Sequence, residues 1–136
     1  MRESVFVDTG AWVALADADD AHHKVAAVTL PLVLKDCKSL VTSNMVVSES
    51  YLLIQRELGH KASMTFLNML TSSPKILIVY STIEIEREAR GILGKYTDQD
   101  FSYTDAVSFA VMRNQGITKC FCFDKHFVTA GFTKIP

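Results

Sequence analysis

Four acidic residues stand where a folded chain does not easily tolerate charge: Asp8, Glu49, Asp105 and Asp124. Two of them end apolar runs, Val5–Val7 and Cys120–Phe123, and the other two lie on apolar helical patterns. A carboxylate that leaves water costs free energy unless a positive group pairs with it. Four such carboxylates at buried ends of elements therefore indicate a shared cation, and hard oxygen ligands suit Mg²⁺ or Mn²⁺. The chemistry to expect is metal-dependent hydrolysis of phosphodiester bonds, with RNA as the expected substrate.

The two acids at strand ends also have a structural explanation. An aspartate between a strand and a helix is a good N-cap, so Asp8 could simply cap the next helix. Asp124 could cap the turn at His126–Phe127, with Lys125 and His126 stabilising its charge. Ligands of parallel sheets, however, bind beyond the carboxyl ends of the strands. If the two strands are neighbours, both carboxylates lie on that edge.

Glu49 lies on an apolar face of a predicted helix. Its neighbours three and four residues away are all apolar: Met45, Val46, Leu52 and Leu53. Two structural explanations stay open, an ion pair with Arg56 seven residues later and a helix that exposes this side and buries the other. The third explanation is a functional site, because catalytic carboxylates are often held in such unfavourable surroundings.

Asp105 carries a similar ambiguity. Ser102 and Asp105 have the spacing of a capping box, and an acid in the first turn of a helix also suits the helix dipole. Phe109 and Met112 share the face of Asp105, which would turn its carboxylate inward. Asp100, in the loop before this helix, could join the site as an outer-shell ligand.

Strands and helices alternate along the chain, and these elements determine where the acids lie. We predict strands at 3–7, 40–42, 76–80 and 119–123, and an edge strand at 132–134. We predict helices at 11–16, 22–35 (with a kink or end at Pro31), 44–58 after a Ser43 cap, 61–71, 82 to 91 or 94, and 103–115. This alternation favours an α/β fold with a mainly parallel sheet covered by helices on both faces, in one domain over residues 1–136.

Composition narrows the functional classes. The net charge of −1 and pI near 6.4 lack the basic footprint of a bulk nucleic-acid binder, so a metal would have to supply much of the attraction for RNA. Arginines could help, or could only solvate helix faces: Arg56, Arg87, Arg90 and Arg113. No apolar stretch is long enough for a membrane span and no signal peptide is recognisable, so we expect a cytoplasmic protein. The three cysteines form no disulfide or zinc framework, and Cys120 and Cys122 should be small core residues on one strand face.

Four segments together resemble the motifs of PIN domains, in the family's order and over nearly the whole chain. They are residues 5–12 (VFVDTGAW), 42–44 (TSN) leading to Glu49, 103–110 (YTDAVSFA), and 123–127 (FDKHF) followed by 130–132 (AGF). The chain resembles most closely the small bacterial VapC-type toxins of VapBC toxin–antitoxin pairs.

This resemblance implies a three-layer α/β/α, Rossmann-like domain with a mainly parallel sheet of five strands. It implies one or two Mg²⁺ or Mn²⁺ ions held by Asp8, Glu49, Asp105 and Asp124, with Thr9 and Thr104 contacting water at the metal. It also implies single-stranded RNA as substrate of an endoribonuclease, a small antitoxin protein as partner, and a homodimer. The alternative from another class is a non-catalytic protein-interaction module, in which the acids are caps and one buried ion pair.

Overall fold

The structure, a computed structural model that describes residues 2–136, contains one parallel sheet. Its strands are β1 (Val5–Val7), β2 (Leu40–Ser43), β3 (Ile76–Val79), β4 (Lys119–Phe121) and β5 (Thr133–Ile135). They lie in the order β3-β2-β1-β4-β5, and every pair is parallel. The α/β prediction is confirmed, and the sheet is parallel throughout.

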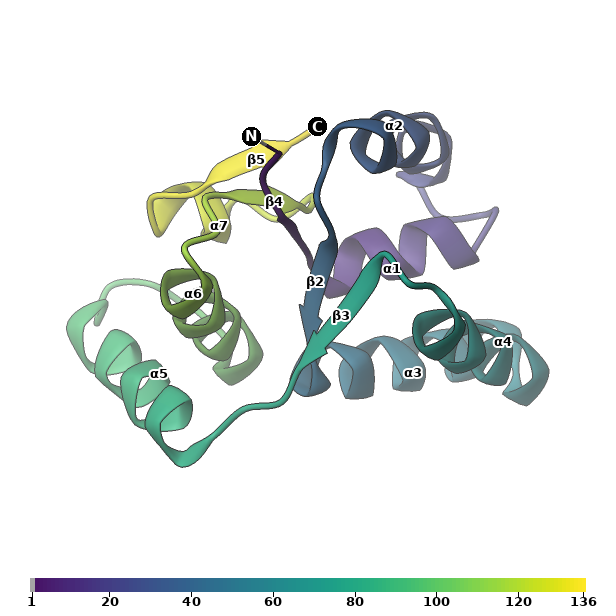
Figure 1. The fold of residues 1–136 in the computed structure, drawn as a ribbon. Coiled ribbons are helices and arrows are strands. Elements are labelled where there is room, and N and C mark those ends of the chain that lie inside the picture. Colours follow the sequence, from purple (N-terminus) through teal and green to yellow (C-terminus); the bar gives the residue numbers. More distant parts are fainter. Residues whose placement is uncertain (1) are drawn as a thin grey trace.

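Helices cover both faces of this sheet. They are α1 (Thr9–Ala16), α2 (His23–Asp36), α3 (Asn44–Leu58), α4 (His60–Ser72), α5 (Ile83–Lys95), α6 (Tyr103–Gln115) and α7 (His126–Thr129). Figure 1 shows α1 to α4 on one side of the sheet and α5 to α7 on the other, which gives the expected three layers. None of the helices in residues 2–136 combines the length and apolarity needed to cross a membrane.

Two helices continue through residues that usually end helices. Pro31 lies inside α2, where its exposed ring points away from the buried residues Ala26 and Val33. In α5, Gly91 and Gly94 do not end the helix, which continues to Lys95. Burial of the apolar face of α5, which packs against α6, outweighs the low helix propensity of glycine.

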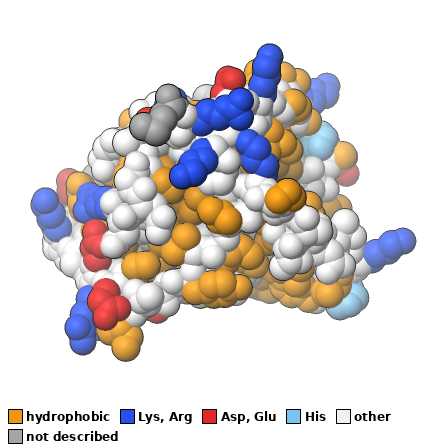
Figure 2. Space-filling view, in the orientation of Figure 1, with side chains coloured by type: hydrophobic (Ala, Val, Ile, Leu, Met, Phe, Trp, Pro, Cys, Tyr) orange, Lys and Arg blue, Asp and Glu red, His pale blue; other side chains and the backbone are white. Residues whose placement is uncertain are grey.

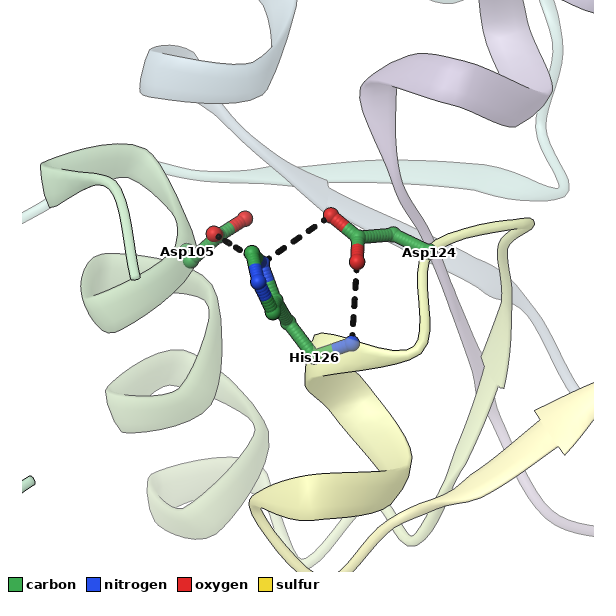
Figure 3. A group of neighbouring side chains, drawn as sticks. All are labelled: Asp105, Asp124 and His126. Carbon is green, nitrogen blue, oxygen red and sulfur yellow. Dashed lines mark hydrogen bonds and ion pairs between the residues drawn. The ribbon is translucent and has the colours of Figure 1, made fainter. Parts of the chain in front are cut away.

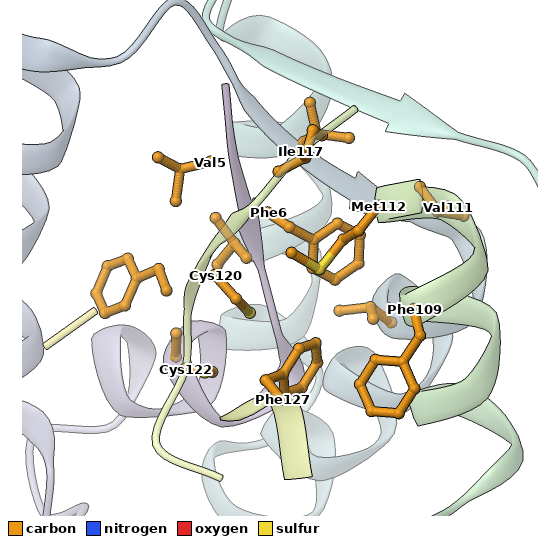
Figure 4. Packing of buried hydrophobic residues seen from close by; sticks show 14 of the residues in the cluster. Val5, Phe6, Phe109, Val111, Met112, Ile117, Cys120, Cys122 and Phe127 are labelled. Atoms are coloured by element: carbon orange, nitrogen blue, oxygen red, sulfur yellow. The ribbon is translucent and has the colours of Figure 1, made fainter. Parts of the chain in front are cut away.

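Part of the core lies between β1, β4, α6 and α7. Phe6, Phe109 and Phe127 are fully buried there, and the rings of Phe109 and Phe127 meet edge to face with centroids 5.0 Å apart (Figure 4). Cys120 and Cys122 are also fully buried, as expected for small core residues. Each large apolar side chain buried here stabilises the fold by about 1.5–3 kcal/mol, so the ends of β1 and β4 are held rigidly.

The strand order reverses between β1 and β4, since the chain runs outward from β1 through β2 to β3 and then returns to β4. The two strands are tied beyond their ends, because the Asp8 amide donates to the carbonyl of Phe121 at 3.1 Å. In the same layer, the buried Thr42 hydroxyl donates to the carbonyl of Val7 at 3.1 Å. This reversal point is where α/β sheets bind ligands, and Asp8 and Asp124 follow the carboxyl ends of the two strands that flank it.

Candidate active site

Three side chains form a compact group at the carboxyl edge of the sheet: Asp105, Asp124 and His126 (Figure 3). One potential ligand atom from each lies within 4.8 Å of the others. His126 Nδ1 is 3.1 Å from Asp105 Oδ2 and 3.2 Å from Asp124 Oδ2. The imidazole therefore stands between two carboxylates that come from α6 and from the end of β4.

His126 contacts a third carboxylate with its other nitrogen. Nε2 lies 3.0 Å from Asp100 Oδ1, in the loop before α6. Partial burial alone would lower the pKa of His126, but the charge of Asp124 and the hydrogen bonds to Asp105 and Asp100 outweigh it and raise the pKa. With both nitrogens facing carboxylate oxygens, the imidazolium is the form that satisfies all these contacts, because it donates from each nitrogen.

Asp8 follows β1 and is the most strongly perturbed carboxylate of the group. Its side chain is buried, with 6% exposure, and makes no capping hydrogen bond to α1 although Asp8 holds the N-cap position. Burial raises its pKa from 3.8 to about 7; a hydrogen bond from the Thr9 backbone opposes the rise, and the charges of Asp105, Asp124 and Glu49 add to it. The three other predicted acids thus all act electrostatically on Asp8.

Glu49 lies on α3, half-buried at the rim of the group. Its charge reaches Asp8, although Asp8 and Glu49 are not part of the compact group around His126. No Glu49–Arg56 ion pair forms within residues 2–136, so that explanation is wrong. Of its apolar neighbours only Val46 is buried, which leaves Glu49 access to solvent.

The premise that all four acids are buried is half right. Asp8 and Asp105 are buried at 6% and 8% exposure, whereas the Asp124 side chain is 39% exposed and Glu49 is half-buried. Asp124 and Glu49 both reach solvent, so neither needs a cation for its own solvation. Asp8 carries most of the unfavourable energy, because it is buried and surrounded by like charges.

Asp105 and Asp124 both form the predicted caps and still face the site. Asp105 and Ser102 form the predicted capping box, in which each side chain accepts from the other residue's amide at 3.0 Å. Asp124 Oδ1 accepts from the His126 amide at 2.9 Å, as expected for a cap before that turn. In both aspartates the Oδ2 atom still faces His126, so the caps orient the carboxylates toward the site.

Two hydroxyl groups beside the acids lack partners. Among buried side chains of residues 2–136, Thr9 Oγ1 and Ser50 Oγ have no hydrogen-bonding atom in reach. They directly follow Asp8 and Glu49 in the chain. Thr104, the other predicted water contact, is half-buried in the first turn of α6 beside Asp105. Buried polar groups are normally satisfied, so Thr9 indicates a missing polar ligand or water close to Asp8.

His126 was considered only as a support for Asp124, and its central position was not predicted. The signal available was its place two residues after Asp124, at the start of a helix too short to bury it fully. His22 stacks on Phe123 with ring centroids 4.3 Å apart and planes 7° apart. Nothing local in the sequence pairs these two rings, because they come together only through the fold.

The four acids line neither of two cavities found in the described residues. Two cavities of about 490 and 480 Å³ are lined by other residues, at the sheet face below α2 and between α1, α3 and α4. Arg56 and Arg113 lie in the last turns of α3 and α6, whereas Glu49 and Asp105 lie earlier in those helices.

Known proteins share this architecture. The family model described as PIN domain matches residues 5–132. The 23S rRNA-specific endonuclease VapC20 of Mycobacterium tuberculosis is 35% identical over 135 residues, which cover 96% of this chain and 97% of that protein.

Solved structures agree. The crystal structure of M. tuberculosis VapC20, a toxin that cleaves the sarcin–ricin loop, superposes with a TM-score of 0.87 at 34% identity, over 96% of this chain and 98% of that one. The crystal structure of VapBC2 from Rickettsia felis, bound to a DNA fragment from its promoter, superposes with a TM-score of 0.72 at 12% sequence identity, over 97% of both chains. The crystal structure of FitAcB from Neisseria gonorrhoeae superposes with a TM-score of 0.64 at 18% sequence identity, over 97% of this chain and 96% of that one. With a full-length family match and a relative above 30% identity, this chain belongs to the PIN-domain family.

Proposed function

We propose that this protein is a metal-dependent endoribonuclease of the VapC type, with Asp8, Glu49, Asp105 and Asp124 as its reaction centre and one domain over residues 1–136 as its scaffold. The observation that carries the proposal is the convergence of the four carboxylates at the strand-order reversal, with Asp8 buried among three like charges.

The residues present fit a divalent cation. Asp105 and Asp124 offer oxygens within 4.8 Å of each other, and Asp8 adds a buried carboxylate whose pKa of about 7 a nearby cation would lower. The unpartnered Thr9 Oγ1 leaves an acceptor for water beside Asp8. An all-oxygen set of carboxylates suits Mg²⁺ or Mn²⁺ better than Zn²⁺, which favours nitrogen and sulfur ligands.

Asp8, Asp105 and Asp124 would hold the cation directly, and Glu49, at the more open rim, would hold it or orient the attacking water. When bound, the cation supplies charge stabilisation to the phosphate and makes water a better nucleophile near neutral pH. The protein's own part is orientation. Ser102 and the His126 amide fix Asp105 and Asp124, and the β1–β4 hydrogen bond fixes Asp8. Asp100 acts through His126 from outside.

Substrate and partners follow from the relatives. VapC20 is named for cleavage of 23S rRNA and of the sarcin–ricin loop, and we propose RNA of that kind, presented as a single-stranded segment, as the substrate here. VapBC2 and FitAcB are toxin–antitoxin proteins, which supports a small antitoxin as the cognate inhibitor, and we further propose a homodimer as the assembly. An RNA substrate is consistent with a cytoplasmic location.

The test is cleavage of a labelled panel by purified protein. The panel holds a sarcin–ricin-loop RNA, unrelated single-stranded RNAs, and a DNA of the same sequence, each with Mn²⁺, Mg²⁺ or EDTA. Cutting of RNA but not DNA, abolished by EDTA, is expected. Intact RNA in every condition, together with a melting temperature that Mn²⁺ does not raise, would favour the non-catalytic interaction module instead.

A further inference from the structure

Resting on the proposed function, we propose that Tyr80, Tyr103 and Arg90 form a docking surface for the single-stranded RNA segment that flanks the cleaved bond. The aromatic rings would take bases and the guanidinium a phosphate. We call these three residues the Tyr80 surface. Tyr80 follows the end of β3, Arg90 lies on α5, and Tyr103 begins α6, the helix that also carries Asp105.

A chain of hydrogen bonds holds this surface beside the reaction centre. The Ser81 amide donates to Asn44 Oδ1 at 2.8 Å, at the start of α3, and the Ser81 hydroxyl donates to Glu86 at 3.2 Å. Glu86 also accepts from the Tyr103 hydroxyl at 2.6 Å. The chain therefore links the helix that carries Glu49 to the helix that carries Asp105, across the carboxyl edge.

Two large apolar side chains project from this segment without packing. Tyr80 is 67% exposed and Ile83 is 66% exposed, and Tyr103 remains 36% exposed despite its hydrogen bond. Figure 2 shows hydrophobic side chains gathered on the face over β3, where Leu77 is also exposed. Exposed tyrosines beside a nuclease site are suited to stacking on bases, which every base permits regardless of sequence.

Arg90 makes the surface suitable for a nucleic acid. Hydrogen bonds from Tyr103 and Ser81, together with the nearby charge of Arg90, hold the pKa of Glu86 below its ordinary value. The guanidinium of Arg90 also lies close enough to Tyr103 to act on its hydroxyl. Glu86 thus holds Tyr103 by a hydrogen bond with the charge of Arg90 close by, and the exposed guanidinium can meet a phosphate while the ring meets the base.

The spacing fits a strand that passes over the acids. Val79 pairs with Ser43 in the sheet, and β2 pairs with β1, so Tyr80 stands two strands to the side of Asp8. Two strand spacings amount to about 10 Å. At about 3.4 Å per stacked nucleotide, this separation corresponds to about three nucleotides. The Tyr80 surface would therefore hold bases about two to three positions from the cleaved bond.

The experiment separates binding from chemistry. Anisotropy of a labelled single-stranded RNA is measured with variants built on Asp8→Asn, which cannot cleave it, and single-turnover cleavage is measured with the same variants on the wild type. We expect Tyr80→Ala and Tyr103→Ala to weaken binding about tenfold each and to leave the rate at saturation within about threefold, and Tyr80→Phe to behave as wild type. Arg90→Ala should reduce the salt slope of binding by about 0.7.

Matched controls lie on α2. Val28→Ala removes an apolar side chain that is 68% exposed, and Lys35→Ala removes an exposed positive charge; neither should change affinity or salt slope. Melting temperatures confirm folding of every variant. The inference is overturned if wild type cleaves RNA while Tyr80→Ala and Arg90→Ala bind as tightly as the controls. It is equally overturned if Tyr80→Ala changes only the oligomeric state, which would make the surface a protein contact. Wild type that neither binds nor cuts RNA would refute the proposed function itself.

Discussion

Replacement of the Asp8 carboxylate by a neutral amide should stabilise the metal-free protein, and increasingly so as the pH rises. The pKa of Asp8 is about 7 in the folded protein and 3.8 in its unperturbed state. Between these values the folded chain binds a proton that the unfolded chain has released, so the free energy of unfolding falls as the pH rises. The stability from Asp8 is therefore complete below about pH 3.8 and lost by about pH 7. The amide of Asp8→Asn does not titrate, so the free energy of unfolding of this variant does not fall with pH for this reason.

The size of the effect follows from the same two values. At 1.36 kcal/mol per pKa unit, the difference between 3.8 and about 7 corresponds to about 4 kcal/mol. The advantage of Asp8→Asn over wild type should be below about 1 kcal/mol near pH 4 and reach about 4 kcal/mol at pH 8. For a chain of this length, that is a difference in melting temperature of about 10–15 °C.

Thermal or urea unfolding in EDTA from pH 4 to pH 8 measures this directly. Asp19→Asn, at an exposed aspartate of the turn after α1, is the control and should follow the wild type. His126 also gains stability at low pH, since its pKa is raised, but it does so in both proteins and largely cancels in the comparison. Parallel pH profiles of wild type and Asp8→Asn would refute the reasoning, because they would mean that Asp8 is not desolvated in the folded state.

Three further results are expected. Mn²⁺ at a hundred times its dissociation constant should stabilise the wild type by about 2.7 kcal/mol, and Asp8→Asn much less, as seen in melting curves; equal gains would place the ion elsewhere. Thr42→Val should lower the free energy of unfolding by about 1–3 kcal/mol in urea titrations, because it removes the buried donor to Val7 and the acceptor for Trp12 Nε1 at 3.4 Å; an unchanged midpoint would count against that link. Ser102→Ala should cost about 1 kcal/mol of stability and also slow cleavage, because the lost hydroxyl accepts from the Asp105 amide and so fixes the backbone that carries this carboxylate; full activity would mean that the cap is only structural.

Local sequence patterns predicted the positions of three acids in the fold, because each position depends only on a few neighbouring residues. Asp8 and Asp124 follow buried strands, and the spacing of Ser102 and Asp105 defines a capping box, so each could be recognised from a few neighbouring residues. That β1 and β4 are neighbours depends on the order of strands in the sheet, which no local pattern reports. The family resemblance implied a mainly parallel sheet of five strands but no strand order, and only the structure places β1 beside β4.

What could not be predicted depends on packing between distant segments. Glu49 lies on an apolar pattern, yet α3 turns only part of that face inward, so its burial was overestimated. His126 and Asp100 meet because the loop before α6 folds toward α7. The exposure of Tyr80 depends on β3 being an edge strand with no helix over this residue. In each case the side chain's surroundings come from residues far away in the chain.

Single-turnover cleavage of the sarcin–ricin-loop RNA in Mn²⁺ by wild type, Asp8→Asn, Asp105→Asn and the exposed control Asp19→Asn tests most directly whether the converging carboxylates are the reaction centre. We expect wild type and Asp19→Asn to cut at equal rates, and both site variants to remain folded but to lose more than about 100-fold in rate. Folded Asp8→Asn or Asp105→Asn protein that cuts RNA at the wild-type rate would contradict the assignment of the active site.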